Sequence, residues 1–132
     1  MYLVTGGAFQ GKLDYALGQT KLTRECFIDG KTADQEDIFH AEGIFDFHLY
    51  VKRFLTSCGQ KELEAFAQRL HEENPGLVII TDEIGCGVVP LDKEDRRCRV
   101  CTGRVCTALA ERAERVDRVV CGIGQVLKGG QK

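Results

Sequence analysis

A glycine-rich loop near residue 6 constrains the fold of this chain more than any other feature of its sequence. The loop runs from Gly6 to Lys12 and lies between a short apolar run, residues 1–5, and a helical pattern over residues 12–18. An apolar run that stops at glycine is typical of a buried parallel strand. The loop matches the pattern G-x4-G-K, in which backbone N–H groups and the following helix N-terminus surround a phosphate. The sequence therefore predicts a strand, a phosphate-binding loop and a helix in succession.

The loop pattern also predicts what its side chains do. Glycines let the backbone approach a phosphate closely, and Lys12 is expected to bridge the outer phosphates of a nucleoside triphosphate as a catalytic group. The next position usually carries Ser or Thr, whose hydroxyl binds Mg²⁺, but here it is Leu13. Either carboxylates and water hold the Mg²⁺, or the loop binds phosphate without efficient transfer. A plainer alternative is a glycine-rich turn with an exposed lysine. The predicted nucleotide-binding residues of the loop are Gly6, Gly7, Ala8, Phe9, Gln10, Gly11, Lys12 and Leu13.

Apolar periodicity predicts strands and helices that alternate along the chain. Strands are expected at 1–5, 26–29, 77–81 and 116–121, and helices at 12–18, 34–40, 44–56, 60–73 and 92–115. The run at 77–81 is almost entirely apolar, as expected of a strand that is covered on both faces. Alternating strands and helices predict an α/β fold with a mostly parallel sheet. We expect a single domain over residues 1–132, with a frayed tail from Lys128.

Composition and charge argue against several classes of partner. The formal net charge is −2 and the pI is about 5.9, whereas binding to nucleic acid or to an anionic membrane needs a basic surface. No apolar run approaches the roughly 18 residues of a membrane span. Residues 1–5 lack the basic and long apolar segments of a secretory signal, which predicts a cytoplasmic protein. In a reducing cytoplasm the seven cysteines are expected to be free, buried thiols.

Carboxylates follow the strand predicted at 77–81. Asp82 and Glu83 stand where the carboxyl end of a parallel strand would place them at the ligand-binding edge of the sheet. One could hold a Mg²⁺-bound water and the other could orient an attacking hydroxyl. Both are candidate metal ligands, and Glu83 is also a candidate catalytic residue; the alternative is that they are ordinary acidic residues that end a strand. Asp46 is a third candidate metal ligand, although it falls within a predicted helix.

The segment from Asp82 onward carries a longer signature. Its core, Glu-Ile-Gly-Cys-Gly-Val-Val-Pro at residues 83–90, is far more specific than the phosphate loop. Together with residues 4–12, this signature resembles the adenosylcobinamide kinase / adenosylcobinamide-phosphate guanylyltransferase family of cobalamin biosynthesis, which shows Asn-Glu-Val-Gly-x-Gly-Ile-Val-Pro at this point. The resemblance covers residues 1–18 and 77–128. Further matching positions are Arg96, Arg99, Gly103, Arg104, Ala110, Ala113, Val116 and Gly122.

The resemblance implies a fold and an activity. The fold would be a three-layer P-loop NTPase of the RecA-like type. The activity would comprise binding of GTP or ATP with Mg²⁺, phosphorylation of a cobinamide hydroxyl, and GMP transfer through a covalent histidine intermediate. The family also suggests a homo-oligomer. At the family's spacing, Arg99 becomes a candidate phosphate ligand in the nucleotide site.

The sequence departs from this family at several points. Leu13 replaces the Mg²⁺-binding serine, Asp82 replaces the asparagine of the motif, and the region between the second strand and residue 77 is short. The family's guanylylated histidine lies in that region, where His40 and His48 are the local candidates; His48 falls on an apolar helix face, which favours a core histidine. These departures favour a shortened, divergent relative that binds nucleotide and has lost guanylyl transfer.

Two further patterns leave alternatives open. Cys98, Cys101 and Cys106 form C-x2-C-x4-C on a predicted helix, which is compatible with a metal site that also uses Cys86, or with small residues that pack the helix. The candidate functions are therefore a phosphotransferase acting on a cobinamide-like hydroxyl, a non-catalytic nucleotide-binding regulatory or partner protein, and a metal or redox module. The sequence does not distinguish ATP from GTP.

Overall fold

The structure is a computed structural model that describes residues 1–8, 10–83 and 92–129. These residues form a six-stranded sheet with the strand order β2-β3-β4-β1-β5-β6. All neighbouring strands are parallel except β6, which runs antiparallel to β5. The prediction of an α/β fold with a mostly parallel sheet is confirmed. The strands are β1 (Tyr2–Gly6), β2 (Phe27–Asp29), β3 (Gly43–Phe45), β4 (Val78–Asp82), β5 (Arg115–Val120) and β6 (Ile123–Lys128).

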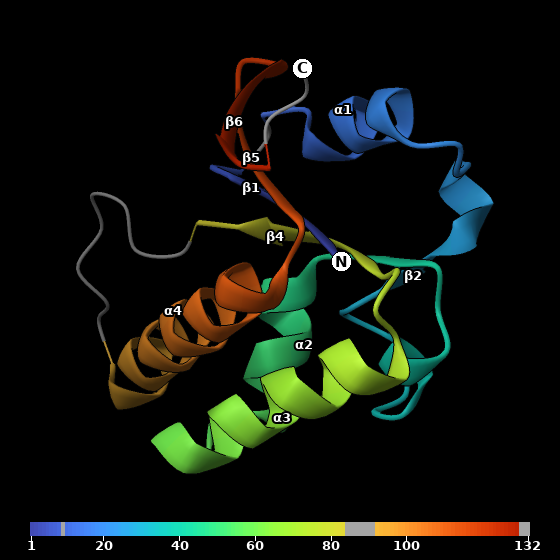
Figure 1. Ribbon diagram of the computed structural model, residues 1–132. Helices are drawn as coiled ribbons and strands as arrows, with labels where there is room; N and C mark the ends of the chain where they lie inside the picture. Colours follow the sequence, from blue (N-terminus) through green and yellow to red (C-terminus); the bar gives the residue numbers. More distant parts are fainter. Residues whose placement is uncertain (9, 84–91, 130–132) are drawn as a thin grey trace.

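Helices cover both faces of the sheet, which gives three layers (Figure 1). The side chains of β4 show how both faces become core. Ile79 packs with α2, α3 and α4, whereas Val78 and Ile80 point to the opposite face and pack with α1. A strand covered in this way has no polar face, which explains the continuous apolar run in the sequence. The helices are α1 (Lys12–Gln19), α2 (Phe47–Phe54), α3 (Gln60–Glu73) and α4 (Lys93–Arg112).

Two strands were not predicted from the sequence. The helix expected over 44–56 is wrong at its beginning, because Gly43–Phe45 forms β3 and the helix starts only at Phe47. The helix expected over 34–40 is a single 3₁₀ turn at Asp37–Phe39. Ile123–Lys128 forms β6, which pairs with β5 at the edge of the sheet. The strand predicted at 77–81 and the helix predicted at 60–73 are confirmed.

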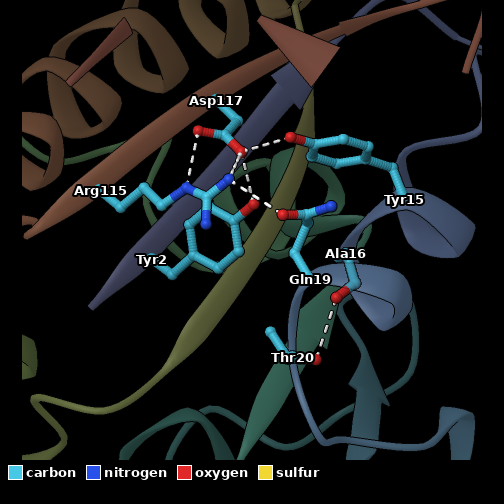
Figure 2. Close-up of polar contacts among 7 residues, drawn as sticks. All are labelled: Tyr2, Tyr15, Ala16, Gln19, Thr20, Arg115 and Asp117. Carbon is cyan, nitrogen blue, oxygen red and sulfur yellow. Dashed lines mark hydrogen bonds and ion pairs between the residues drawn. The ribbon is translucent and has the colours of Figure 1, made fainter. Parts of the chain in front are cut away.

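A fully buried carboxylate fixes α1 against the sheet (Figure 2). Asp117 lies on β5, and its Oδ2 accepts hydrogen bonds from the hydroxyl of Tyr2 at 2.6 Å and of Tyr15 at 2.7 Å. Arg115 donates to both carboxylate oxygens, at 3.1 and 2.8 Å, and also to the side chain of Gln19. Because Tyr15 and Gln19 belong to α1, this cluster sets the position of the helix that the glycine-rich loop enters.

The same cluster shifts the ionisation of its members. Burial raises the pKa of Tyr2 and Tyr15, and their hydrogen bonds to the carboxylate raise it further. Burial alone would raise the pKa of Asp117, but the hydrogen bonds from Arg115 and the two phenols outweigh it, so that this pKa is lowered. The carboxylate is therefore ionised and the phenols are protonated at neutral pH, the states in which their hydrogen bonds form.

Candidate functional site

The glycine-rich loop leaves β1 at Gly6 and enters α1 at Lys12, as the sequence predicts. Two of its glycines are required by geometry. Gly11, the residue before the helix, has a left-handed φ of 79°. A Cβ at Gly6 would lie 2.5 Å from the carbonyl oxygen of Val119 on the neighbouring strand, which no side chain could tolerate. Phe9, a predicted loop residue, lies outside the described residues.

The loop is held from both sides by backbone hydrogen bonds. The backbone N–H of Glu83 donates to the carbonyl oxygen of Gly6 at 2.7 Å. On the other side, the N–H groups of Cys121 and Gly122 donate to the side-chain and backbone oxygens of Gln10, at 2.6 and 2.8 Å. The turn between β5 and β6 therefore supports the loop. The Gln10 side-chain oxygen accepts a bond from this turn.

Lys12 is the buried cation of the site. Its ammonium donates to the carbonyl oxygen of Gly7 at 2.7 Å and pairs with Asp82 Oδ1 at 2.6 Å, and only 8% of its side chain is exposed. A lysine in a plain glycine turn would extend into water, so this geometry disfavours the alternative of an exposed lysine. It also brings together two predicted site residues that are separated by 70 positions in the sequence.

Carboxylates from neighbouring strand ends meet at this edge of the sheet. Asp82 is the last residue of β4, Asp46 follows β3 directly, and Asp29 ends β2. Asp46 has a left-handed φ of 54°, and no ion pair to it is found among the described residues. Burial raises the pKa of Asp46, and the nearby charge of Asp29 raises it further. A carboxylate that is destabilised by burial and by a second acid is a suitable ligand for a cation.

Asp46 and Asp82, but not Asp29, line a cleft of about 390 Å³ beside the loop. The lining combines the loop with residues from the ends of three other segments. Sequence reasoning missed Arg24 and Phe45, because nothing in their local pattern shows that the 3₁₀ turn before β2 and the end of β3 approach the loop. Leu13, which stands at the position of the usual serine or threonine, also lines the cleft. The described lining residues are Ala8, Gln10, Gly11, Lys12, Leu13, Asp14, Arg24, Phe45, Asp46, Ile80 and Asp82.

His48 is not one of the described residues that line the cleft, but it contacts Asp82, which does. The backbone N–H of Asp82 donates to His48 Nδ1 at 3.2 Å, and His48 Nε2 lies 3.5 Å from Asp82 Oδ2. Because Nδ1 accepts a hydrogen bond, the proton of the neutral ring belongs on Nε2, facing the carboxylate. Burial lowers the pKa of His48, although the charges of Asp82 and Asp46 oppose this shift. His48 is thus a neutral group that positions Asp82. This role is close to the sequence-based expectation that His48 is a core histidine.

Two other predicted site residues, Glu83 and Arg99, are not among the described residues that line the cleft. The carboxylate of Glu83 accepts hydrogen bonds from the guanidinium of Arg118 at 2.8 and 3.3 Å, which joins the end of β4 to β5. Arg99 lies half buried on α4 and is not among the described residues that line the cleft. The metal and catalytic roles of Glu83 and the phosphate-binding role of Arg99 remain predictions.

The cysteines are free wherever the structure describes them, including Cys98, Cys101 and Cys106 on α4. No group of three His, Cys, Asp or Glu side chains is arranged to hold a metal ion in the described ranges. Cys86 lies outside those ranges. Among the described helices, none is both long and apolar enough to cross a membrane.

The fold has three layers, and a glycine loop with a buried lysine joins a strand to a helix at the carboxyl edge of its sheet. These features define a P-loop NTPase of the RecA-like type. A family model described as cobinamide kinase / cobinamide phosphate guanyltransferase matches residues 46–127. The chain therefore belongs to this enzyme family. It is also similar to a bifunctional adenosylcobalamin biosynthesis protein of Pseudomonas aeruginosa, with 40% identity over 68 residues. The matched segment is 52% of this chain and 39% of that protein, so the chain spans about two-fifths of the length of its curated relative.

Proposed function

We propose that this chain binds GTP or ATP in the cleft beside residues 6–12 and transfers a phosphoryl group to a hydroxyl of a cobinamide-type substrate. The observation that carries the proposal is the position of the Lys12 ammonium, which donates to the carbonyl oxygen of Gly7 and pairs with the carboxylate of Asp82. An ammonium in this place can leave its carboxylate partner for the outer phosphates of a nucleotide. Membership of an enzyme family named for cobinamide supports the class of acceptor.

Mg²⁺ fits the donor set if it retains several water molecules. Asp46 and Asp82 both line the cleft and are the carboxylates that would hold the ion. Leu13 offers no hydroxyl, and the carboxylate of Glu83 is bonded to Arg118. When bound, Mg²⁺ would neutralise charge on the transferred phosphoryl group. Arg24 also lines the cleft and would add a second cation for the same phosphates.

Guanylyl transfer is not part of the proposed activity, because the histidines are poorly placed for it. His48 has one nitrogen bonded to the backbone of Asp82 and the other directed at the Asp82 carboxylate. His40 lines a different cavity with Val78, the first residue of β4, and therefore lies at the opposite edge of the sheet from Lys12. A nucleophilic histidine must reach the α-phosphate, and neither arrangement favours that contact.

Calorimetric titration with GTP and then ATP, with and without Mg²⁺, is the first test. We expect one site whose affinity increases with Mg²⁺, followed by phosphorylation of cobinamide in a coupled assay. A phosphohistidine-type GMP adduct after mixing with GTP would overturn the exclusion of guanylyl transfer. Absence of nucleotide binding under all conditions would overturn the proposal itself.

A non-catalytic nucleotide sensor is the second candidate. Leu13 favours it, because the hydroxyl that usually binds Mg²⁺ is missing from the cleft. This candidate predicts binding that does not depend on Mg²⁺ and no turnover with cobinamide. The same titrations therefore separate the two candidates.

Replacement of Asp46 should reveal its role as a metal ligand. In Asp46→Asn, we expect the gain in nucleotide affinity on adding Mg²⁺ to disappear, while binding without Mg²⁺ is retained. The pKa of Asp46 is raised. In the unmodified protein, the gain in nucleotide affinity on adding Mg²⁺ should therefore be lost on acidification at a higher pH than if the ligand were an aspartate with an ordinary pKa. Titrations at several pH values measure both effects. Asp34→Asn, on an exposed turn, is the control; an unchanged Mg²⁺ effect in Asp46→Asn would refute the assignment.

A further inference from the structure

A second cavity, of about 600 Å³, lies on the face of the molecule that carries α2, α3 and α4. One wall is the turn from Thr56 to Gly59, between α2 and α3. The other wall is formed by α4, with Arg96, Arg97, Val100 and Arg104. α3 and α4 begin on the same side of the molecule, so the turn that precedes α3 lies beside the first turns of α4 (Figure 1). No described residue lines both this groove and the cleft of Lys12.

The groove is lined by arginines, and its own described lining contains no acid; Arg104 also borders a neighbouring cavity that contains Glu64 and Glu111. Among the described residues, no ion pair is formed by the guanidinium groups of Arg96, Arg97 or Arg104. By contrast, Arg69 and Arg115, elsewhere on the surface, are each paired with carboxylates. Three arginines that line one groove attract an anion more strongly than three arginines dispersed over a convex surface.

An acid does lie close to the groove, but it is already engaged. The carboxylate of Glu62 accepts a hydrogen bond from the backbone N–H of Gly59 at 3.0 Å. Gly59 itself has no side chain to cap α3, so the positive end of this helix faces the turn. The hydroxyl of Ser57 adds a neutral donor on the same wall. The donors of the groove therefore suit an external ligand whose several oxygen atoms accept hydrogen bonds.

We propose that this groove is a second oxyanion site, which takes the phosphate group of a phosphorylated small molecule. Planar guanidinium groups match the geometry of phosphate oxygens, and the hydroxyl of Ser57 adds a neutral donor. A volume of about 600 Å³ is large enough for a phosphate together with part of the molecule that bears it. The phosphate could belong to the polyphosphate chain of a nucleotide or to a phosphate monoester. The inference stands apart from the P-loop assignment, because it uses none of the same residues.

The test is a calorimetric titration of the full chain with inorganic tripolyphosphate in the absence of Mg²⁺. In a Lys12→Ala background, which weakens the P-loop site, one binding site should remain. Arg97→Ala or Arg104→Ala should each weaken this site about tenfold, the loss expected for one charge-assisted contact. Lys93→Ala removes the same charge from an exposed position at the start of α4 and should leave the affinity unchanged.

A thiol in the groove provides a local readout. Cys58 lines the groove and is half exposed, so bound tripolyphosphate should slow its alkylation, measured on its own tryptic peptide. Cys26, which is similarly exposed but lies before β2, should react at the same rate with and without the ligand. This measurement needs no substitution, so it remains valid if an arginine variant fails to fold.

Each outcome decides a separate question. Equal losses in Lys93→Ala and Arg104→Ala, or no protection of Cys58, would overturn the second site. Tighter binding of tripolyphosphate than of inorganic phosphate would support the site and favour a polyphosphate chain as its ligand. Equal binding of the two would support the site and identify a monoester. Loss of Mg²⁺-dependent GTP binding with the groove still active would contradict the proposed function alone.

Discussion

Lys12→Ala should weaken the binding of GTP or ATP by at least about a hundredfold. The Lys12 ammonium would give up its bond to Asp82 and form charge-assisted bonds to the outer phosphates, each contributing roughly 1.5–3 kcal/mol. Calorimetric titration in the presence of Mg²⁺ measures the loss. The matched control is Lys21→Ala, which removes an exposed lysine beside His40, at the opposite edge of the sheet.

The same variant should remain folded. Its cost is the loss of a partner for Asp82, whose side chain is 27% exposed and can bind water instead. We therefore expect the free energy of unfolding to fall by no more than about 2 kcal/mol. Unchanged nucleotide affinity in a folded Lys12→Ala protein would eliminate the P-loop assignment. Loss of the fold would instead mean that the ammonium–carboxylate pair is mainly structural.

Asp117→Ala should lower the free energy of unfolding by about 3–5 kcal/mol, a large part of the stability of a domain of this size. The substitution leaves the guanidinium of Arg115 and the hydroxyls of Tyr2 and Tyr15 without their shared acceptor (Figure 2). Urea unfolding followed by circular dichroism measures the change. Asp34→Ala, at an exposed turn, should change the free energy by less than about 0.5 kcal/mol.

Acid should reproduce part of this effect. The pKa of Asp117 is lowered in the folded state, so its contribution to stability is complete above the ordinary aspartate pKa of about 4 and is lost as the pH falls through the lowered value. The unmodified protein should therefore lose stability more steeply on acidification than Asp117→Asn. Parallel pH profiles for the two proteins would contradict the role given to this carboxylate.

The sequence predicted those elements whose apolar pattern has a single interpretation. Residues 60–73 repeat at helical spacing between a glycine and Asn-Pro-Gly, and the structure has α3 at these residues. β3 is different, because it has only three residues and runs directly into α2, so that Ile44 fits the apolar face of a longer helix equally well. β6 was missed because it lies at the edge of the sheet, where exposed positions such as Ile123 obscure the alternation of buried and exposed residues.

The site was predictable where its chemistry is local. The glycine loop, Lys12 and Asp82 follow from a strand that ends in glycine and a strand that ends in acid. The position of Asp46 could not be derived, because it depends on recognising β3 as a strand rather than as the first turn of a helix. Arg24 could not be derived either, since its approach to the cleft depends on where β2 joins the sheet.

The support of the phosphate loop by the β5–β6 turn determines when this site can exist during folding. Gln10 is bonded to Cys121, 111 positions away, and Gly6 packs against the backbone of Val119. Contacts between such distant parts of a chain form late, because the entropy of closing the intervening segment must be overcome first. A nascent chain that has emerged only as far as α4 would have its glycine loop but not the support for it. Under the proposed function, nucleotide capture would therefore mark completed tertiary assembly rather than early local structure.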